Sequence, residues 1–365
     1  MDELAPSNHV GTVLFFSANK DDNPKFVARL EKSLEKTLTR YYPLAGRYVQ
    51  EMRAVDCSDQ GAEFIYSKAD MSLQDILDSQ WDAKFVDELI PSIMLGGADE
   101  ITYPILAIQV NTLLCGDVGL GVSISHRLAD ASTLCTFLNE WAVMNREDNE
   151  VELTGTGFSI PPLFPGRDLP PHKIAPCNIV TKKLSFSESE IADMKVQFMI
   201  NEKDGPQYLS KVQIVSAIIW KALINVDRAT RSQPRDSFLL QLLNLRGRSA
   251  SLIPKDSCGN LVAPFPTKSS NDETIQGWCK FPFYEADFGF GKPICVTMGS
   301  APRKNVVYLL DGMGCKGVDA YVFAQEDFVL RGALPLPSSP VSLPLAEVST
   351  SHCLASATLV FLLTR

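Results

Sequence analysis

The sequence predicts an α/β protein of two domains, each with a mixed β-sheet flanked by helices, from three observations. Segments with the alternating period of a strand are interspersed with segments of helical period along the whole chain. Its 365 residues exceed the size at which one hydrophobic core usually stops growing. A stretch rich in proline and glycine, residues 155–180, reads as a crossover between two halves that could each bury a core.

In the first half, a helix is predicted to begin at Asp22-Asn23-Pro24, where a cap residue precedes a proline in the first turn. Residues 105–114 alternate apolar and polar side chains, glycines follow, and residues 122–125 alternate again, which predicts two neighbouring strands. The second strand leads into His126, and helical spacing resumes beyond Asp130. This domain is expected to span residues 1–154.

In the second half, a strand is predicted over residues 182–186. Two capping boxes, Ser187 with Glu190 and Ser210 with Gln213, each open a helix, and the second helix is apolar enough to be buried on most sides. Further strands are predicted at 238–245, 306–310 and 320–323. The C-terminal domain is expected to span residues 181–330, and the serine-rich, almost charge-free residues 331–365 form an atypical tail.

The composition narrows the classes of partner. A net charge of −9 and a pI near 5.1 argue against nucleic acid, because phosphate backbones are bound through clustered Lys and Arg. The nine cysteines are scattered without a Cys-x-x-Cys pair, which indicates reduced thiols and no metal site. The N-terminus lacks the features of a secretory signal and no apolar run approaches about 20 residues, so a soluble, cytoplasmic protein without a membrane partner is expected.

His126 is the first candidate for catalysis. A histidine at a strand end is held by the sheet and can accept a proton near neutral pH, so it could act as a general base on a hydroxyl or an amine. The competing interpretation is a hydrogen-bonded histidine at the start of a helix. Small neighbours, Ser125 and Ala129, leave room for a ligand, whereas Asp130 is better placed to brace the loop than to activate the imidazole.

Three strings in this order resemble the plant BAHD acyltransferases: Tyr42-Pro43-Leu44-Ala45-Gly46-Arg47, His126-x-x-x-Asp130, and Asp287-Phe288-Gly289-Phe290-Gly291. Further similarity at Asn244-Leu245-Arg246 and Trp278-Cys279 points to the vinorine synthase-like clade, whose members acetylate alkaloid or terpenoid alcohols. Asp-Phe-Gly also occurs in protein kinases, but the glycine-rich loop and the His-Arg-Asp order of a kinase are missing. The resemblance implies two chloramphenicol acetyltransferase-like domains.

The resemblance also implies roles for the site residues. His126 would be the general base, Asp130 would pair with Arg246 to hold the histidine loop, and Asp287, Gly289 and Gly291 would form a structural turn. Trp278 would contact a substrate or a developing oxyanion, with core packing as the alternative. The implied partners are acetyl-CoA as acyl donor and a small-molecule alcohol as acceptor. The resemblance further implies that the protein is a monomer and that it binds no metal.

Departures from the family pattern leave a second hypothesis open. In the resembled family an additional strand precedes the position that matches Asp2, the segment before Trp278 is longer than here, and the tail of this chain is unfamiliar. These features are compatible with a truncated, catalytically inactive relative that keeps the fold or binds a small molecule. A third hypothesis is acylation of an amine by the same residues.

Overall fold

The computed structural model describes residues 8–18, 23–78, 83–91, 103–146, 157–158, 178–200, 209–230, 237–248, 253–269, 281–301, 305–325 and 360–364. The chain forms two compact units. The first consists of Met1–Lys173, Leu245–Val262 and Phe281–Pro302, and the second of Ile174–Asn244, Ala263–Lys280 and Arg303–Arg365. The sequence-based division assigns the two later segments of the first unit to the C-terminal domain. Most of the predicted crossover, residues 159–177, lies outside the described residues.

The first unit is built on a five-stranded mixed sheet in the order β10-β1-β6-β5-β4. Its strands are β1 (His9–Phe16), β4 (Glu63–Lys68), β5 (Leu106–Thr112), β6 (Val118–Ser125) and β10 (Cys295–Met298). Neighbouring strands pair antiparallel except for the parallel pair β4 and β5. The antiparallel pairing of β5 with β6 confirms the two neighbouring strands predicted from the alternating pattern.

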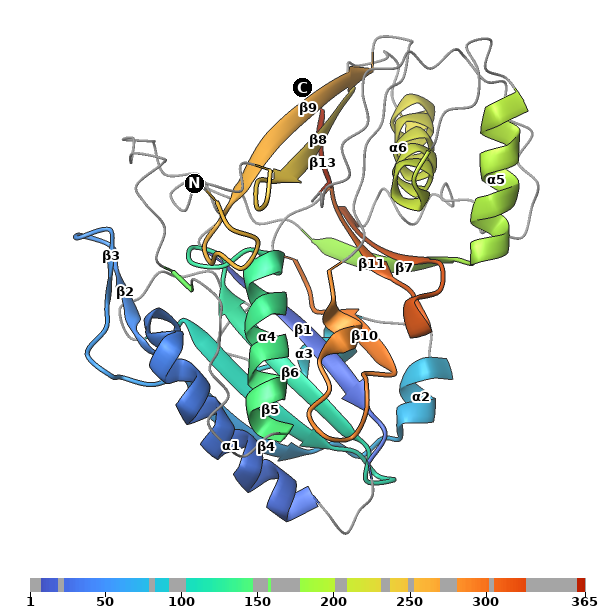
Figure 1. Ribbon diagram of the computed structural model, residues 1–365. Helices are drawn as coiled ribbons and strands as arrows, with labels where there is room; N and C mark the ends of the chain where they lie inside the picture. Colours follow the sequence, from blue (N-terminus) through green and yellow to red (C-terminus); the bar gives the residue numbers. More distant parts are fainter. Residues whose placement is uncertain are drawn as a thin grey trace. The chain divides into compact units, whose positions relative to one another are not determined.

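Two layers of helix cover this sheet (Figure 1). The helices α1 (Asn23–Arg40) and α4 (Ala131–Arg146) lie side by side, and Phe288 joins them to the sheet through ring contacts with Phe16 on β1 and Trp141 on α4. Because side chains alternate along a strand, Val13 and Phe15 lie on the face of the sheet opposite to Phe16. They pack in a core cluster with side chains of α2 (Leu73–Asp78) and α3 (Ala83–Asp87).

A glycine lets the chain after α3 approach the sheet closely. A Cβ atom at Gly121 would lie 1.9 Å from the carbonyl oxygen of Leu89, so no other residue fits at this point of β6. The amides of Gln109 and Asn111 on β5 donate hydrogen bonds to the carbonyls of Glu88 and Leu89 respectively. The segment after α3 is thereby fixed against β5 and β6, the strand that leads to His126.

Short elements complete the first unit. They are the 3-10 helices η3 (Tyr42–Ala45) and η5 (Phe283–Glu285) and the hairpin of β2 (Arg47–Val49) and β3 (Ala54–Asp56). Arg47 donates to the carbonyls of Gly46 and Gly61, which ties the start of β2 to the loop beyond β3. The Tyr-Pro-Leu-Ala-Gly-Arg string therefore forms a helical turn followed by a short strand.

The second unit contains a six-stranded sheet in the order β7-β12-β11-β13-β8-β9, with α5 and α6 as its helices. Its elements are β7 (Ile179–Phe186), α5 (Glu188–Ile200), α6 (Lys211–Thr230), β8 (Ser237–Asn244), β9 (Val262–Ser269), β11 (Val306–Asp311), η6 (Met313–Cys315), β12 (Val318–Gln325) and β13 (Val360–Thr364). Within the tail at 331–365, residues 360–364 therefore form a strand, β13, between β11 and β8.

Both predicted capping boxes are confirmed. The Ser187 hydroxyl accepts from the Glu190 backbone N–H while the Glu190 carboxylate accepts from the Ser187 N–H, and Ser210 with Gln213 repeats the pattern. The α6 helix carries a largely buried face that includes Trp220, whose indole N–H donates to Ser237 at 2.7 Å. Among the helices that the structure describes, none combines the length and apolar character needed to cross a lipid bilayer.

Candidate active site

His126 lies directly after the last residue of β6, at the start of the turn that leads into α4. Its backbone N–H donates to the carbonyl of Asn8 at 2.9 Å, which extends the pairing of β1 with β6 by one residue. The N–H groups of Leu128 and Ala129 then bond back to the Ser125 carbonyl and close the turn. The sheet on one side and the turn on the other therefore hold the backbone of this half-buried histidine.

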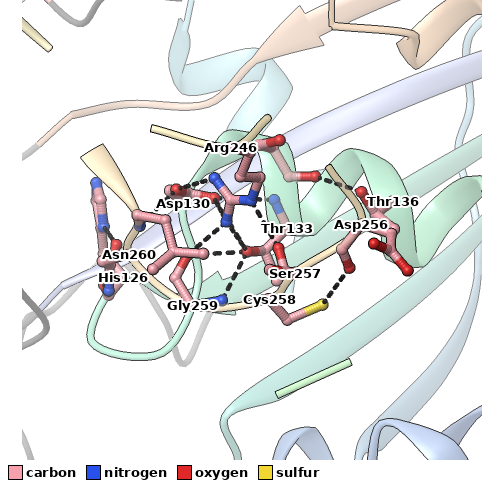
Figure 2. Close-up of polar contacts among 12 residues, drawn as sticks. His126, Asp130, Thr133, Thr136, Arg246, Asp256, Ser257, Cys258, Gly259 and Asn260 are labelled. Atoms are coloured by element: carbon pink, nitrogen blue, oxygen red, sulfur yellow. Dashed lines mark hydrogen bonds and ion pairs between the residues drawn. The ribbon is translucent and has the colours of Figure 1, made fainter. Parts of the chain in front are cut away.

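Asp130 directly precedes α4 and forms an ion pair with Arg246, which follows β8 (Figure 2). As the N-cap residue, Asp130 accepts through Oδ1 from the backbone N–H of Thr133 at 2.9 Å. Arg246 binds both carboxylate oxygens, with Nη1–Oδ2 at 2.8 Å and Nη2–Oδ1 at 3.0 Å, and the two side chains are only 2% and 5% exposed. Such a bidentate pair between planar groups fixes orientation as well as distance.

The same groups fix the backbone of residues 257–261. Arg246 donates from Nε to the carbonyl of Ser257 at 2.6 Å and from Nη2 to that of Gly259 at 2.8 Å. The Thr133 hydroxyl accepts from the Gly259 N–H at 3.0 Å, and Asp130 Oδ2 accepts from the Leu261 N–H at 3.1 Å. The segment is thus bonded on both sides of Asn260 to the start of α4.

Asn260 connects this segment to His126, as Figure 2 shows. Its Nδ2 donates to the carbonyl oxygens of His126 at 2.8 Å and of Arg127 at 3.1 Å, and its Oδ1 lies 3.2 Å from Nδ1 of the imidazole. The neighbouring Arg127 guanidinium stacks over the ring of Tyr48 at 5.0 Å, which links the turn to the β2–β3 hairpin. Both residues after β6 are therefore restrained by side chains from distant parts of the chain.

Cys258 is the thiol nearest in sequence to Asn260. The side chain is buried, and this burial, with nearby carboxylates, raises the pKa of the thiol to about 12 despite the opposing effect of Arg246. Burial also raises the pKa of Cys135 on α4. Because the thiolate is the reactive form of cysteine, neither residue is suited to act as a nucleophile at neutral pH.

The Asp287–Gly291 string forms a tight turn whose side chains bind α1 and α4. Asp287 Oδ1 accepts from the N–H groups of Gly289 at 2.8 Å and Gly291 at 3.0 Å. These glycines have φ values of +103° and +91°, the left-handed region that favours glycine. Phe288 is fully buried, and the ring of Phe290 lies 3.9 Å from that of Phe26 on α1.

This turn and the His126 turn lie at opposite ends of α4. Asn145 and Arg146, the last residues of α4, donate to the carbonyls of Phe288 and Asp287 respectively, whereas Asp130 precedes its first residue. A 16-residue helix is about 24 Å long. The glycine-rich turn therefore anchors the far end of the helix whose N-terminal end carries the polar network around Asp130.

The structure brings His126, Asp130 and Arg246 into one network and holds Asp287, Gly289 and Gly291 in a separate turn. Trp278 lies outside the described residues. Thr133 and Asn260 were not predicted as site residues, although the pair Gly259-Asn260 is a local signal of a turn. Within the described part of the chain, no cluster of His, Cys, Asp and Glu could hold a metal ion.

Comparison with known proteins identifies the family of the chain. The model of the transferase family matches residues 1–277 and 267–328. Stemmadenine O-acetyltransferase from Catharanthus roseus is 29% identical over 379 residues, with 90% of this chain and 88% of that protein covered. A pelargonidin-glucoside malonyltransferase from Salvia splendens is 30% identical over 391 residues, at 90% and 89% coverage.

Vinorine synthase from Rauvolfia serpentina is similar in both sequence and structure. It is 28% identical over 375 residues, with 90% of this chain and 88% of that protein covered. Its crystal structure matches with a TM-score of 0.77 at 27% identity, covering 90% of this chain and 89% of that one. The predicted chloramphenicol acetyltransferase-like α/β fold is thereby confirmed. The chain is an acyltransferase that belongs to the transferase family, the BAHD acyltransferases.

Proposed function

We propose that this protein transfers an acyl group from an acyl-CoA to the hydroxyl of a small molecule, with His126 as the general base. The observation that carries the proposal is the restraint on His126, whose backbone is fixed by the end of β6 and whose Nδ1 faces an uncharged amide oxygen of Asn260. In a half-buried imidazole held in this way, Nδ1 serves in positioning, and we propose Nε2 as the atom that takes the proton. Family membership supplies the donor class, an acyl-CoA thioester.

The reaction needs a base because an alcohol is a poor nucleophile at neutral pH. As the alcohol oxygen attacks the thioester carbonyl carbon, Nε2 of His126 takes the hydroxyl proton. The tetrahedral intermediate collapses, the bond between carbon and sulfur breaks, and the departing CoA thiolate takes this proton from the imidazolium. General-base catalysis of this kind contributes about 10²- to 10⁴-fold.

A direct transfer agrees with the state of Cys258, which lies two residues before Asn260 in the sequence. A covalent acyl-enzyme would require an activated nucleophile, and Cys258 remains a protonated thiol because its pKa is raised to about 12. We propose that the ester forms in one attack on the donor, with both substrates bound together. Asp130 and Arg246 serve as structural support, since their polar atoms bond to each other and to the backbone of residues 257–261.

We propose acetyl-CoA as the donor and a plant specialised metabolite, an alkaloid or terpenoid alcohol, as the acceptor. Similarity to stemmadenine O-acetyltransferase supports this pair, whereas the similar malonyltransferase makes malonyl-CoA the competing donor. We further propose that the protein works in the cytoplasm as a monomer without nucleic acid. A net charge of −9 favours neither a phosphate backbone nor an anionic membrane surface as partner.

The proposal is tested by incubating the purified chain with acetyl-CoA or malonyl-CoA and a panel of alkaloid and terpenoid alcohols, while release of free thiol is followed. Turnover is expected with the wild type and a loss of about 10²-fold or more with His126→Ala. His9→Gln is the matched control, because glutamine can still donate to the Pro104 carbonyl that His9 Nε2 contacts. Equal turnover by His126→Ala would refute the role of His126.

The same experiment distinguishes an active acyltransferase from a catalytically inactive relative. A chain that keeps the fold but cannot catalyse would give no thiol release with any pair of substrates. Its binding is measured by thermal stabilisation with CoA, which reaches about 2.7 kcal/mol at a hundredfold excess over the dissociation constant. Stabilisation without turnover would favour a small-molecule binding protein over an enzyme.

A further inference from the structure

The two nitrogens of the His126 ring are not equivalent in the proposed reaction. A neutral imidazole carries its proton on one nitrogen, and only the other can accept a proton from the alcohol. The partner of the first nitrogen decides which tautomer is present. The contacts of Asn260 with His126 therefore bear directly on which ring nitrogen is basic.

The hydrogen-bond partners of Asn260 determine the orientation of its side-chain amide. The atom placed 2.8 Å and 3.1 Å from the carbonyl oxygens of His126 and Arg127 must be the nitrogen, because a carbonyl oxygen can only accept. The amide oxygen is then the atom 3.2 Å from Nδ1 of the ring. Since this oxygen can only accept as well, Nδ1 must carry the proton, and Nε2 holds the lone pair.

Asn260 is itself held on both sides by the start of α4. The preceding Gly259 bonds through its N–H to the Thr133 hydroxyl and through its carbonyl to Thr133 and Arg246. The following Leu261 donates its N–H to Asp130 Oδ2. A change at Asp130 or Thr133 would therefore move the backbone that carries the Asn260 amide.

We propose that Asn260 is a positioning residue that keeps the neutral His126 ring in the Nδ1–H tautomer, and that Asp130 acts on the ring through Asn260. The inference rests on the proposed function, because it concerns the nitrogen that serves as the base. It explains how an aspartate fully engaged with Arg246, Thr133 and Leu261 can govern the chemistry of a neighbouring imidazole. The coupling passes through hydrogen bonds to the Gly259 and Leu261 backbone and needs no charge transfer.

A purely structural role for Asn260 makes a different prediction. If its amide only ties the turn together through the two carbonyls, its loss would lower stability and leave the tautomer of the folded protein unchanged. The two roles are separated by ¹⁵N NMR of histidine-labelled protein, in which a protonated ring nitrogen resonates far from an unprotonated one. Only four histidines contribute signals, and comparison with His126→Gln identifies those of His126.

In the wild type, Nδ1 of His126 is expected to be protonated and Nε2 unprotonated at a pH where the ring is neutral. Asn260→Leu, which keeps the branched shape but removes both the acceptor and the donor of the amide, is expected to shift the ring toward the Nε2–H tautomer. Asn139→Leu is the matched control, since its amide also donates to two carbonyls, those of Cys135 and Pro282, but on the α4 helix surface. An Nδ1–H ring in Asn260→Leu, or an Nε2–H ring in the wild type, would overturn the proposal.

Kinetics test the second half of the inference. Asn260→Leu is expected to lower kcat by about 10- to 100-fold with little change in KM, within the range of a general base. If Asp130 acts through Asn260, adding Asp130→Asn to Asn260→Leu should lower kcat no further than the more severe single change, within about threefold. Multiplying effects would refute this route.

Thr133→Val provides a milder probe if Asp130→Asn does not fold, because it removes the hydroxyl bonds to Gly259, Asp130 and Arg246 Nη2 but leaves the ion pair between Asp130 and Arg246. It is expected to shift part of the His126 ring population to the Nε2–H tautomer, and an unchanged population would count against the route through residues 259–261. The NMR measurements need no turnover. A failure of the proposed reaction is therefore distinguishable from a failure of the tautomer assignment.

Discussion

Replacing Arg246 with methionine is predicted to destabilise the first unit strongly. The change removes the guanidinium but keeps an apolar stem, and it leaves the Asp130 carboxylate, 5% exposed, without its counter-ion. Removing one partner of a buried ion pair typically costs about 3–5 kcal/mol, because the remaining charge stays desolvated. The carbonyls of Ser257 and Gly259 also lose donors. For a domain of this size the loss corresponds to a fall in Tm of about 6–20 °C.

The assay is thermal and urea-induced unfolding followed by tryptophan fluorescence, with Lys292→Met as the matched control. Lys292 pairs with Glu285 in the same unit, but the two side chains are 61% and 53% exposed, and such pairs contribute about 0–1 kcal/mol. Adding Asp130→Asn to Arg246→Met should recover part of the lost stability, since the uncompensated charge is removed. A Tm shift for Arg246→Met no larger than that for Lys292→Met would contradict the cost of the unpaired Asp130 charge, as would simple additivity of Arg246→Met and Asp130→Asn.

Two further predictions concern parts of the first unit away from His126. Gly289→Ala is expected to cost about 1–3 kcal/mol of stability, because φ is +103° and the new Cβ would lie 3.0 Å from Nη2 of Arg29, while kcat stays within about twofold. Gly61→Ala, at φ +83° with open space around it, is the control that separates backbone strain from crowding. A large fall in kcat of Gly289→Ala at constant stability would contradict an anchoring role for the Asp287–Gly291 turn. Burial raises the pKa of Glu140 above its usual 4.5 in spite of the nearby Arg40 charge. The folded state therefore holds the proton of the Glu140 carboxyl more tightly than the unfolded state does. The stability of the wild type is lost as the pH rises through the raised pKa. The Tm of Glu140→Gln measured relative to wild type should therefore increase between about pH 4 and pH 7.5, and a decrease over that interval would show that the sign is wrong.

Local sequence signals predicted the secondary structure well where the interacting residues are close in the chain. Ser187 with Glu190, and Ser210 with Gln213, each lie three positions apart, and both form the predicted caps. The alternation over β5 and β6 identified a pair joined by a short turn. Such elements depend on hydrogen bonds and side-chain periods that are completed within a few residues, so the sequence contains all the information they need.

Contacts between distant segments were not accessible from periodicity. The strand β13 within the tail pairs with β11 and β8, and β10 adds to the edge of the first sheet beside β1. Asn260 meets His126 across 134 residues of sequence. No local pattern specifies such a partner, because the pairing depends on how the intervening chain folds.

The sequence by itself determined the α/β class, the position of His126 at a strand end and, through three strings in order, the resemblance to an acyltransferase family. It also indicated an aspartate at the start of the following helix, which is a local preference of helix N-termini. The family resemblance implied the pairing of Asp130 with Arg246, but only the tertiary structure decided that residues 257–261 close around this pair and that an asparagine faces Nδ1 of the imidazole. The physical reason is that the direction of a hydrogen bond depends on which donors and acceptors meet in space, and these come from segments that the chain brings together only when it folds.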